Sequence, residues 1–210
     1  MKKYIIPAVL FIGFILFTVA VKFVDVQAIG PENSLVGFAT VNAFVHNFVG
    51  EHKIWDLITD LFVVIAIFTA CGFAVLGLVQ LVKNRSLFKV DREIILLGGF
   101  YVLVVILYGF FEKVIINYRP VLEDGILEAS YPSSHTMVLL CILGTARSVF
   151  GKYIKNKKIL KAVRIFCAVM MIFAVAGRIL SGVHWFTDIL GALFVSAALI
   201  QFYNSLLKKD

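Results

Sequence analysis

Six long apolar segments divide the chain. Four of them contain no charged residue, and the other two are interrupted by a single arginine near one end, Arg147 or Arg178. A membrane-spanning helix needs roughly 20 predominantly apolar residues, and an arginine near a helix end can extend its charged group to the membrane surface. The pattern therefore predicts six spanning helices. They are Tyr4–Val21, Leu61–Val82, Ile94–Phe111, Thr136–Gly151, Ile165–Val183 and Ile189–Leu207.

The segment from Pro31 to Asp60 resembles neither a spanning helix nor an ordinary loop. Apolar residues recur in it at helical spacing with polar residues between them, which is typical of a helix with one apolar face. The apolar positions are Leu35, Phe38, Val41, Val45, Phe48 and Val49. We expect an amphipathic helix on the outer face of the bundle. It either packs on the ends of the spanning helices or controls the entry of a lipid.

Composition excludes several classes of protein. Hydrophobic residues make up 61% of the 210 positions and charged residues only 16%, whereas a soluble domain has about 25% charged residues. The chain therefore lacks the polar surface of a soluble enzyme. Its 3 cysteines all lie in apolar runs and indicate no disulfide framework. Without a repeat or a composition shift, the prediction is one all-α domain over residues 1–210: a six-helix transmembrane bundle with an amphipathic helical segment on its outer face.

The basic residues predict the orientation of this bundle. A net charge of +7 by itself would admit a nucleic-acid partner. If the amino terminus is cytoplasmic, however, 15 of the 20 Lys and Arg residues fall on the cytoplasmic side, as the positive-inside rule requires. We therefore expect a multi-pass cell-membrane protein with both termini cytoplasmic and no nucleic-acid partner. A cleaved leader ending at Ala28 is the alternative for the first segment, although its apolar run exceeds the about 7–15 residues usual in signal peptides.

Three short stretches at the outer mouths of the helices carry groups suited to chemistry. They are Lys113–Pro120 after the third span, Tyr131–His135 before the fourth, and Gly177–Asp188 between the fifth and the sixth. In the second stretch, Pro132 followed by two serines and an apolar run is typical of a helix start. Free backbone N–H groups and serine hydroxyls at such a start bind anions.

A histidine and an aspartate are correctly spaced to act as a pair. His184 and Asp188 lie four residues apart at the expected start of the last helix, so they share one face of it. Asp188 can accept a hydrogen bond from one ring nitrogen and leave the other free, which makes His184 a nucleophile or a base. The simpler role of Asp188 is to cap its helix. His135, at the mouth of the fourth span, is suited to protonating a leaving oxygen.

Basic side chains complete the set. Arg119 and Arg178 carry planar groups that match phosphate oxygens, and Lys113 adds a point charge. All three stretches fall on one side of the membrane in a topology assigned from other residues. Such a set is suited to phosphoryl transfer, in which most of the catalysis is positioning and charge neutralisation.

The three stretches resemble the signature of the type 2 phosphatidic acid phosphatase superfamily of integral membrane lipid phosphatases: K-x6-R-P, P-S-G-H and S-R-x5-H-x3-D. The resemblance covers about residues 111–192. It implies that His184 attacks phosphorus and becomes a phosphohistidine, that Asp188 orients it, and that His135 protonates the leaving group. It also implies that no metal or other cofactor is needed. The phosphate-holding residues would be Arg119, Arg178, Ser133, Ser134 and Lys113.

The chain departs from this signature at three positions. Lys113 is one residue closer to the arginine than the pattern requires, and Glu112 occupies the usual place. On a regular helix that shift turns the side chain by about 100°. Ser134 replaces the glycine of the second block, and Gly177 replaces the serine before Arg178. None of these changes removes the nucleophile, its orienting acid or the general acid, so we expect an active enzyme.

Several alternatives remain open. The same scaffold could be a catalytically weak lipid-phosphate binder or a phosphotransferase, in which another hydroxyl replaces water. A metal centre of His135, His184 and Asp188 is a further alternative, which the neighbouring basic side chains disfavour. The expected partners are membrane lipids and a lipid phosphate substrate, with no obligatory protein partner. Undecaprenyl diphosphate, phosphatidylglycerophosphate and phosphatidate are all candidate substrates.

Overall fold

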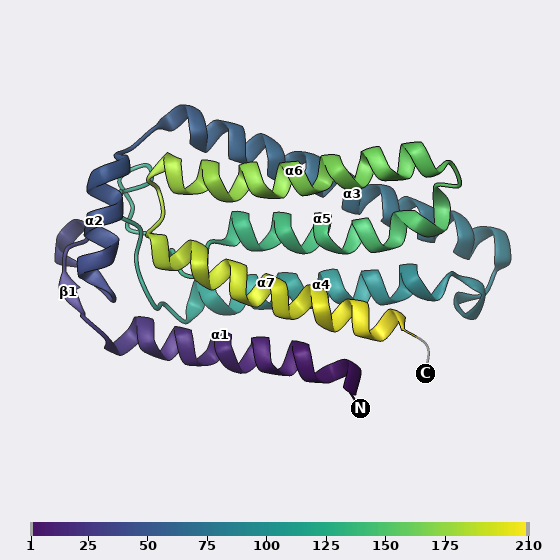
Figure 1. The fold of residues 1–210 in the computed structure, drawn as a ribbon, viewed down its shortest axis with the longest axis horizontal. Helices are drawn as coiled ribbons and strands as arrows, with labels where there is room; N and C mark the ends of the chain where they lie inside the picture. The colour runs from purple at the N-terminus through teal and green to yellow at the C-terminus, as the bar shows by residue number, and fades with distance from the viewer. Residues whose placement is uncertain (1, 209–210) are drawn as a thin grey trace.

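The computed structural model describes residues 2–208 and is almost entirely helical. Among these residues, six helices are long and apolar enough to cross a membrane, which confirms the predicted bundle (Figure 1). They are α1 (Ile5–Phe23), α3 (Lys53–Asn84), α4 (Arg92–Lys113), α5 (Ser134–Tyr153), α6 (Lys157–Ser181) and α7 (Phe186–Leu207). Helices α3 and α6 each begin eight residues earlier than the hydropathy pattern indicated, because their first turns are polar. The protein is thus a multi-pass membrane protein.

Two of the six helices form the centre of the bundle. In α5 and α7, about half of the most apolar window is buried (56% and 50%), whereas in the other four helices the buried share is 11–22%. The outer helices therefore direct most of their leucine, isoleucine and phenylalanine side chains toward lipid. Small residues such as Ala146 and Ala192 lie in the centre and are fully buried, where they allow close packing of the helices.

The segment predicted as one amphipathic helix over Pro31–Asp60 is divided into several shorter elements. A short hairpin pairs β1 (Gln27–Ala28) with β2 (Leu35–Val36), and a single 3-10 turn lies between them. The amphipathic helix itself is only α2 (Ala39–Val49), and residues 53–60 of the segment already belong to α3 (Lys53–Asn84). The prediction is correct in kind but wrong in extent, because the left-handed backbone at Phe38 prevents an earlier helix start.

Helix α2 packs across the ends of the spanning helices rather than lying free. Asn42 on α2 is fully buried; its Nδ2 donates to the carbonyl of Gly37 (2.8 Å) and to Oγ1 of Thr187 (2.9 Å). The Thr187 amide in turn donates to Asn42 Oδ1 (3.1 Å). A Cβ on Gly37 would lie 1.5 Å from the carbonyl oxygen of Val21, so only glycine allows the hairpin to approach the end of α1 this closely.

The opposite end of the bundle is joined by a network around Asp91, the residue before α4. Its carboxylate accepts hydrogen bonds from Gln80 Nε2 (2.7 Å), Lys152 Nζ (2.6 Å) and the Tyr153 hydroxyl (2.6 Å). These bonds hold the pKa of Asp91 down to about 2. Helices α3, α4 and α5 are thereby tied together at the end where both chain termini lie (Figure 1).

Candidate active site

The three chemistry-bearing stretches meet at the end of the bundle away from the termini. The loop after α4, the start of α5 and the connection from α6 to α7 all lie there, next to α2 and the hairpin (Figure 1). The topology produces this meeting because each stretch borders a spanning helix at the same membrane level. The sequence predicted that the three stretches lie on one side of the bundle, and in the structure they do.

His184 lies in the four-residue gap between α6 and α7 and is 4% exposed. Its Nδ1 is 3.6 Å from Oδ2 of Asp188, an ion-pair distance that is longer than a hydrogen bond. Neither ring nitrogen has a hydrogen-bond partner. A buried histidine without partners is unusual for a structural residue and leaves a lone pair free for another group.

The surroundings keep this ring neutral. Burial lowers the pKa of His184 well below its ordinary value, and the charges of Arg178, Arg119 and His135 lower it further, whereas the backbone of Ser130 acts in the opposite direction. The same three residues that act on His184 electrostatically are those expected around a phosphate. A neutral imidazole at neutral pH is the form that can attack phosphorus.

Asp188 is completely buried and performs the capping role as well. Its Oδ2 accepts the amide N–H of Trp185 (2.9 Å), and its Oδ1 accepts Nδ2 of Asn117 (3.4 Å). Its carbonyl oxygen receives the amide of Ser133 (3.0 Å). The carboxylate is therefore fixed beside His184 by contacts that start α7 and join it to the start of α5.

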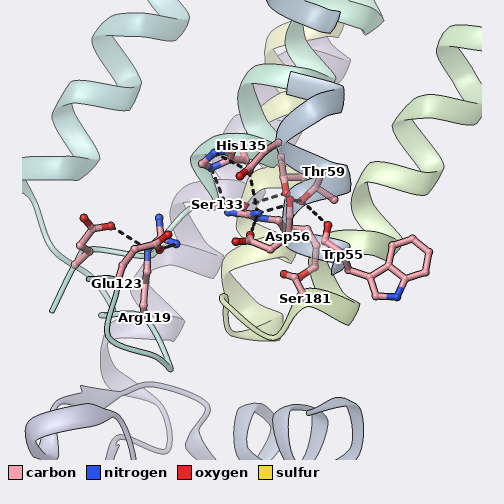
Figure 2. Close-up of polar contacts among 12 residues, drawn as sticks. Trp55, Asp56, Thr59, Arg119, Glu123, Ser133, His135 and Ser181 are labelled. Carbon is pink, nitrogen blue, oxygen red and sulfur yellow. Dashed lines mark hydrogen bonds and ion pairs between the residues drawn. The ribbon is translucent and has the colours of Figure 1, made fainter. Parts of the chain in front are cut away.

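Arg178 is held by carboxylates of α3. Its guanidinium is 2% exposed and pairs with Asp56, with Asp60 at 3.5 Å, and with the hydroxyl of Thr59 at 3.1 Å (Figure 2). In the same cluster its Nη2 lies 3.3 Å from Nδ1 of His135. The arginine thus lies beside the expected general acid, and acidic groups already compensate its charge.

His135 lies between the guanidinium of Arg178 and the carboxylate of Asp60. Besides its Nδ1 contact with Arg178, its Nε2 is 3.4 Å from Oδ1 of Asp60. In the tautomer with the proton on Nε2, the ring accepts from the arginine and donates toward the aspartate. The side chain is one-third exposed (33%), so it can exchange protons with solvent or with a bound group.

Arg119 is nearly buried and also has acidic partners. It pairs with Glu123 through Nη1 and with Glu128 through Nε (3.3 Å), and its amide donates to the carbonyl of Glu128 (3.0 Å). Figure 2 places the pair of Arg119 and Glu123 apart from the cluster around Asp56 and His135. The acidic loop over residues 121–130 therefore folds back onto this arginine.

The helix start predicted at Pro132 is confirmed. Ser133 is the residue before α5 and is completely buried; its hydroxyl lies 3.0 Å from that of Thr136. Ser134 is the first residue of α5 and lines a narrow crevice with Glu112 and Ser130. The backbone N–H groups of this first turn have no intrahelical partner, which fits the predicted anion site.

Lys113 does not join these residues. It is the last residue of α4, its side chain is exposed, and within residues 2–208 it makes no hydrogen bond or ion pair. Helix α4 continues regularly to Lys113, so no bulge offsets the one-residue shift noted in the sequence. Glu112 instead occupies the crevice beside Ser134.

Gly177, the departure before Arg178, has a packing reason. A Cβ at this position would lie 2.9 Å from Cγ2 of Thr59 and 3.2 Å from the Trp55 ring. The absence of a side chain lets α6 approach α3 closely enough for Arg178 to reach Asp56. Glycine in place of the family's serine is therefore linked to the ion pair between Arg178 and Asp56.

Sequence reasoning missed the polar residues of α3 and the asparagine between the basic residues of the first stretch. Asp56 and Asp60 are four residues apart, which places them on one helix face, but they precede the span that hydropathy defines. Asn117, buried at 1%, accepts the Gly37 amide (3.2 Å) and donates to Asp188. A polar residue directly after three apolar ones was the feature of the sequence that could have indicated its buried role.

A cavity of about 350 Å³ opens beside Arg178, between the start of α3 and the loop after α4. Most of its charged lining is acidic. The carboxylates are Glu51, Asp56, Asp60, Glu123 and Asp124. Across residues 2–208 no group of three or more His, Cys, Asp and Glu side chains is arranged to hold a metal ion.

Comparisons with known proteins agree with this geometry. The family model of the PAP2 superfamily matches residues 8–210. A solved structure with the same fold is the transmembrane PAP2 type phosphatidylglycerolphosphate phosphatase from Bacillus subtilis, with a TM-score of 0.62 and 17% sequence identity over 100% of this chain and 99% of that one. No curated protein matches the sequence. The chain belongs to the PAP2 superfamily, whose membership and fold support phosphatase activity on a lipid.

Proposed function

We propose that the protein hydrolyses the phosphate of a membrane lipid through a phosphohistidine on His184. The observation that carries this proposal is the histidine itself: it is buried and neutral, it lacks a hydrogen-bond partner, and it lies next to Asp188 within the field of two arginines. Structural histidines are normally hydrogen-bonded. A ring kept neutral and unpartnered is suited to forming a bond to phosphorus.

The first half-reaction transfers the phosphoryl group to the protein. A free ring nitrogen of His184 forms the N–P bond as the P–O bond to the lipid breaks, and His135 gives its proton to the departing oxygen. The imidazole becomes cationic when it is phosphorylated, and the fixed carboxylate of Asp188 stabilises that charge. Arg119 and Arg178 neutralise the phosphoryl oxygens.

The second half-reaction releases inorganic phosphate. A water molecule attacks the phosphohistidine while His135 accepts its proton, the N–P bond breaks, and His184 returns to its neutral state. The carboxylate of Asp60, 3.4 Å from Nε2 of His135, holds the ring in position between the two steps. Atoms and charges balance with lipid phosphate and water as the reactants and lipid alcohol and phosphate as the products.

Substrate entry requires a change of partners. Both arginines are paired with carboxylates, so a phosphate has to displace Glu123 or Asp56 to reach them. The acidic lining of the cavity repels a substrate with many negative charges, which favours phosphatidate, with its single phosphate group, over phosphatidylglycerophosphate and undecaprenyl diphosphate, each of which carries two. The solved relative from Bacillus subtilis is a phosphatidylglycerolphosphate phosphatase, so that lipid is compared with the other two.

The decisive experiment measures phosphate release by the detergent-purified protein from the three lipids, with and without EDTA, for the wild type and His184→Ala. Release that persists in EDTA and disappears in the variant supports the proposal. Substrate labelled at the phosphoryl group should label the wild type in an alkali-stable, acid-labile form and leave His184→Ala unlabelled. Full turnover by His184→Ala would overturn the mechanism.

The carboxylate pairing of both arginines favours a second candidate: a lipid-phosphate binder with weak turnover. This function predicts retention of a lipid phosphate by the purified protein without release of phosphate from any of the three lipids. Asp56→Asn, which releases Arg178 from its partner, should then raise binding. Added glycerol or another alcohol distinguishes a phosphotransferase, because a phosphorylated alcohol would appear in place of inorganic phosphate.

We also propose that the site faces the extracytoplasmic side. The distribution of Lys and Arg supports this orientation, since most of them lie at the end of the bundle away from the site. Single cysteines placed by Asp124→Cys and by Lys155→Cys, in a chain without its native cysteines, test it with a membrane-impermeant maleimide on intact cells. Labelling at position 124 alone supports the orientation, and labelling at position 155 alone contradicts it.

A further inference from the structure

A groove of about 440 Å³ lies between α5 and α6 at the end of the bundle opposite the candidate active site. Four basic side chains surround one part of it: Arg147 from α5, and Lys157, Lys161 and Arg164 from α6. On α6 these three follow the spacing i, i+4 and i+7, which places them on one helix face.

None of these four cations has an acidic partner within the described chain. Within the described chain, Nε of Arg164 donates a hydrogen bond to the carbonyl oxygen of Arg147 (3.1 Å), and Nε of Arg147 is buried without a partner. In contrast, Lys152, less than two turns further along α5, pairs with both Asp91 and Glu93. Four positive charges without acidic partners thus lie together at the groove.

The remaining lining of the groove is apolar and belongs to the membrane-spanning part of α6. Ile165, Val169 and Ile172 line it and are exposed by 53%, 44% and 68%. Because α6 spans the membrane, these side chains face hydrocarbon chains. The basic residues lie at the helix end, where the headgroups of the lipids are.

We propose that this groove binds an anionic phospholipid of the adjacent leaflet. Its phosphate would contact the four cations, and one acyl chain would lie along Ile165, Val169 and Ile172. Charge complementarity indicates the anionic headgroup, and continuity of the groove with the lipid-facing surface indicates an attached chain rather than a free anion. The site is separate from the proposed phosphatase chemistry, because it lies at the other end of the bundle.

Native mass spectrometry of the full chain, given equal amounts of phosphatidylglycerol and phosphatidylcholine, tests this site. The wild type should retain phosphatidylglycerol, and the variant Arg147→Gln/Lys161→Gln should lose retention by about tenfold or more, given the contribution of each basic residue near anionic lipid. Lys155→Gln/Lys158→Gln is the matched control: it removes the same charge from the same end without lining the groove. Arg147→Lys/Lys161→Arg should restore retention.

Three results would overturn the proposal. The first is equal retention of both lipids by the wild type, and the second is an equal loss in the matched control, which would indicate general attraction to the basic end. The third is full competition by glycerophosphoglycerol, which has the headgroup but no acyl chains. The site would then bind the headgroup alone, without a lipid chain. Size-exclusion profiles of each variant distinguish a lost site from a failure to fold.

Discussion

The two ends of the bundle differ in how well their buried and half-buried polar groups are hydrogen-bonded. At the end with the termini, the Asp91 carboxylate has three donors, and its environment stabilises its charged form. At the other end, His184 is buried with both ring nitrogens unpartnered, and two arginines hold carboxylates in place of a ligand. Satisfied groups stabilise a fold, whereas unsatisfied ones cost free energy and are available for chemistry. The contrast separates the structural end of the molecule from its candidate active end.

The largest effect is expected from His184→Ala. Because the ring supplies the proposed nucleophile, phosphate release should fall by about 10³-fold or more. The melting temperature should change by only a few degrees, because the ring makes no hydrogen bonds that would be lost. Phe48→Ala provides the control, since Phe48 lies on α2 at the same end but is 83% exposed and does not line the cavity. If His184→Ala lost much stability but kept its turnover, His184 would be a structural residue and not the nucleophile.

Arg178→Gln should reduce kcat/KM by about 10²-fold, because one of two cations facing the phosphoryl oxygens is removed. Arg178→Lys should restore only part of this loss, since a lysine cannot supply the planar pair of donors. Kinetics on the preferred lipid, compared with Arg85→Gln at the opposite end, provide the measurement. Equal kcat/KM for Arg178→Gln and the wild type would remove this arginine from the site.

Asp91→Ala should act on stability and leave the chemistry unchanged. Loss of three hydrogen bonds to a partly exposed carboxylate is expected to cost about 1–3 kcal/mol of unfolding free energy, with kcat/KM per folded molecule unchanged. Thermal unfolding in detergent and phosphate release measured on the same preparation test both parts. A drop in kcat/KM without a change in melting temperature would show that the two ends are coupled.

Acid should weaken the Asp91 network in a defined pH window. The folded pKa of Asp91, about 2, lies below its ordinary value of 3.8, so its contribution to stability is complete above about pH 4 and disappears as the pH falls toward 2. Melting temperatures of the wild type should fall over this window more steeply than those of Asp91→Asn. Parallel curves would mean that the network contributes no pH-dependent stability.

The smallest effect is expected from Lys113→Ala, which should change kcat/KM by less than about twofold, because an exposed side chain at a helix end contributes little. Glu112→Lys offers the sharper comparison. It places a cation beside Ser134, where the family pattern has its lysine, and should raise kcat/KM or lower KM. A loss of activity in Lys113→Ala comparable to that of Arg178→Gln would show that this lysine reaches the phosphate.

The sequence was sufficient for the six helices and for the convergence of His135, His184 and Asp188 at one end. Hydropathy and residue spacing are local properties, and the fold preserves both. The partners of the arginines were not accessible in this way. Asp56 and Asp60 precede the apolar run of α3, so a span drawn from hydropathy begins after them. Glu123 and Glu128 reach Arg119 only because the loop turns back on itself, with Glu123 bridged to Ile126, which no periodic pattern encodes.

The extent of the amphipathic segment illustrates the same limit. Apolar positions recur from Leu35 onward, but the first of them belong to a strand and to a residue with left-handed backbone. Buried Asn42 determines the docking of α2 through its hydrogen bonds to Gly37 and Thr187. From sequence, a polar residue such as Asn42 is predicted to face solvent. In the structure it is buried and forms the contact between α2 and the bundle.

Both tryptophans of the chain lie at the candidate active end, which gives the protein its own optical reporter. Trp185 directly follows His184, is buried, and donates from Nε1 to the carbonyl of Tyr118 (2.7 Å), the residue before Arg119. Trp55 directly precedes Asp56, the partner of Arg178, and its ring packs on Gly177. Any exchange of carboxylate for phosphate at either arginine would disturb an indole next to it. Tryptophan fluorescence, excited selectively over that of tyrosine, can therefore follow occupancy of the site in unlabelled protein.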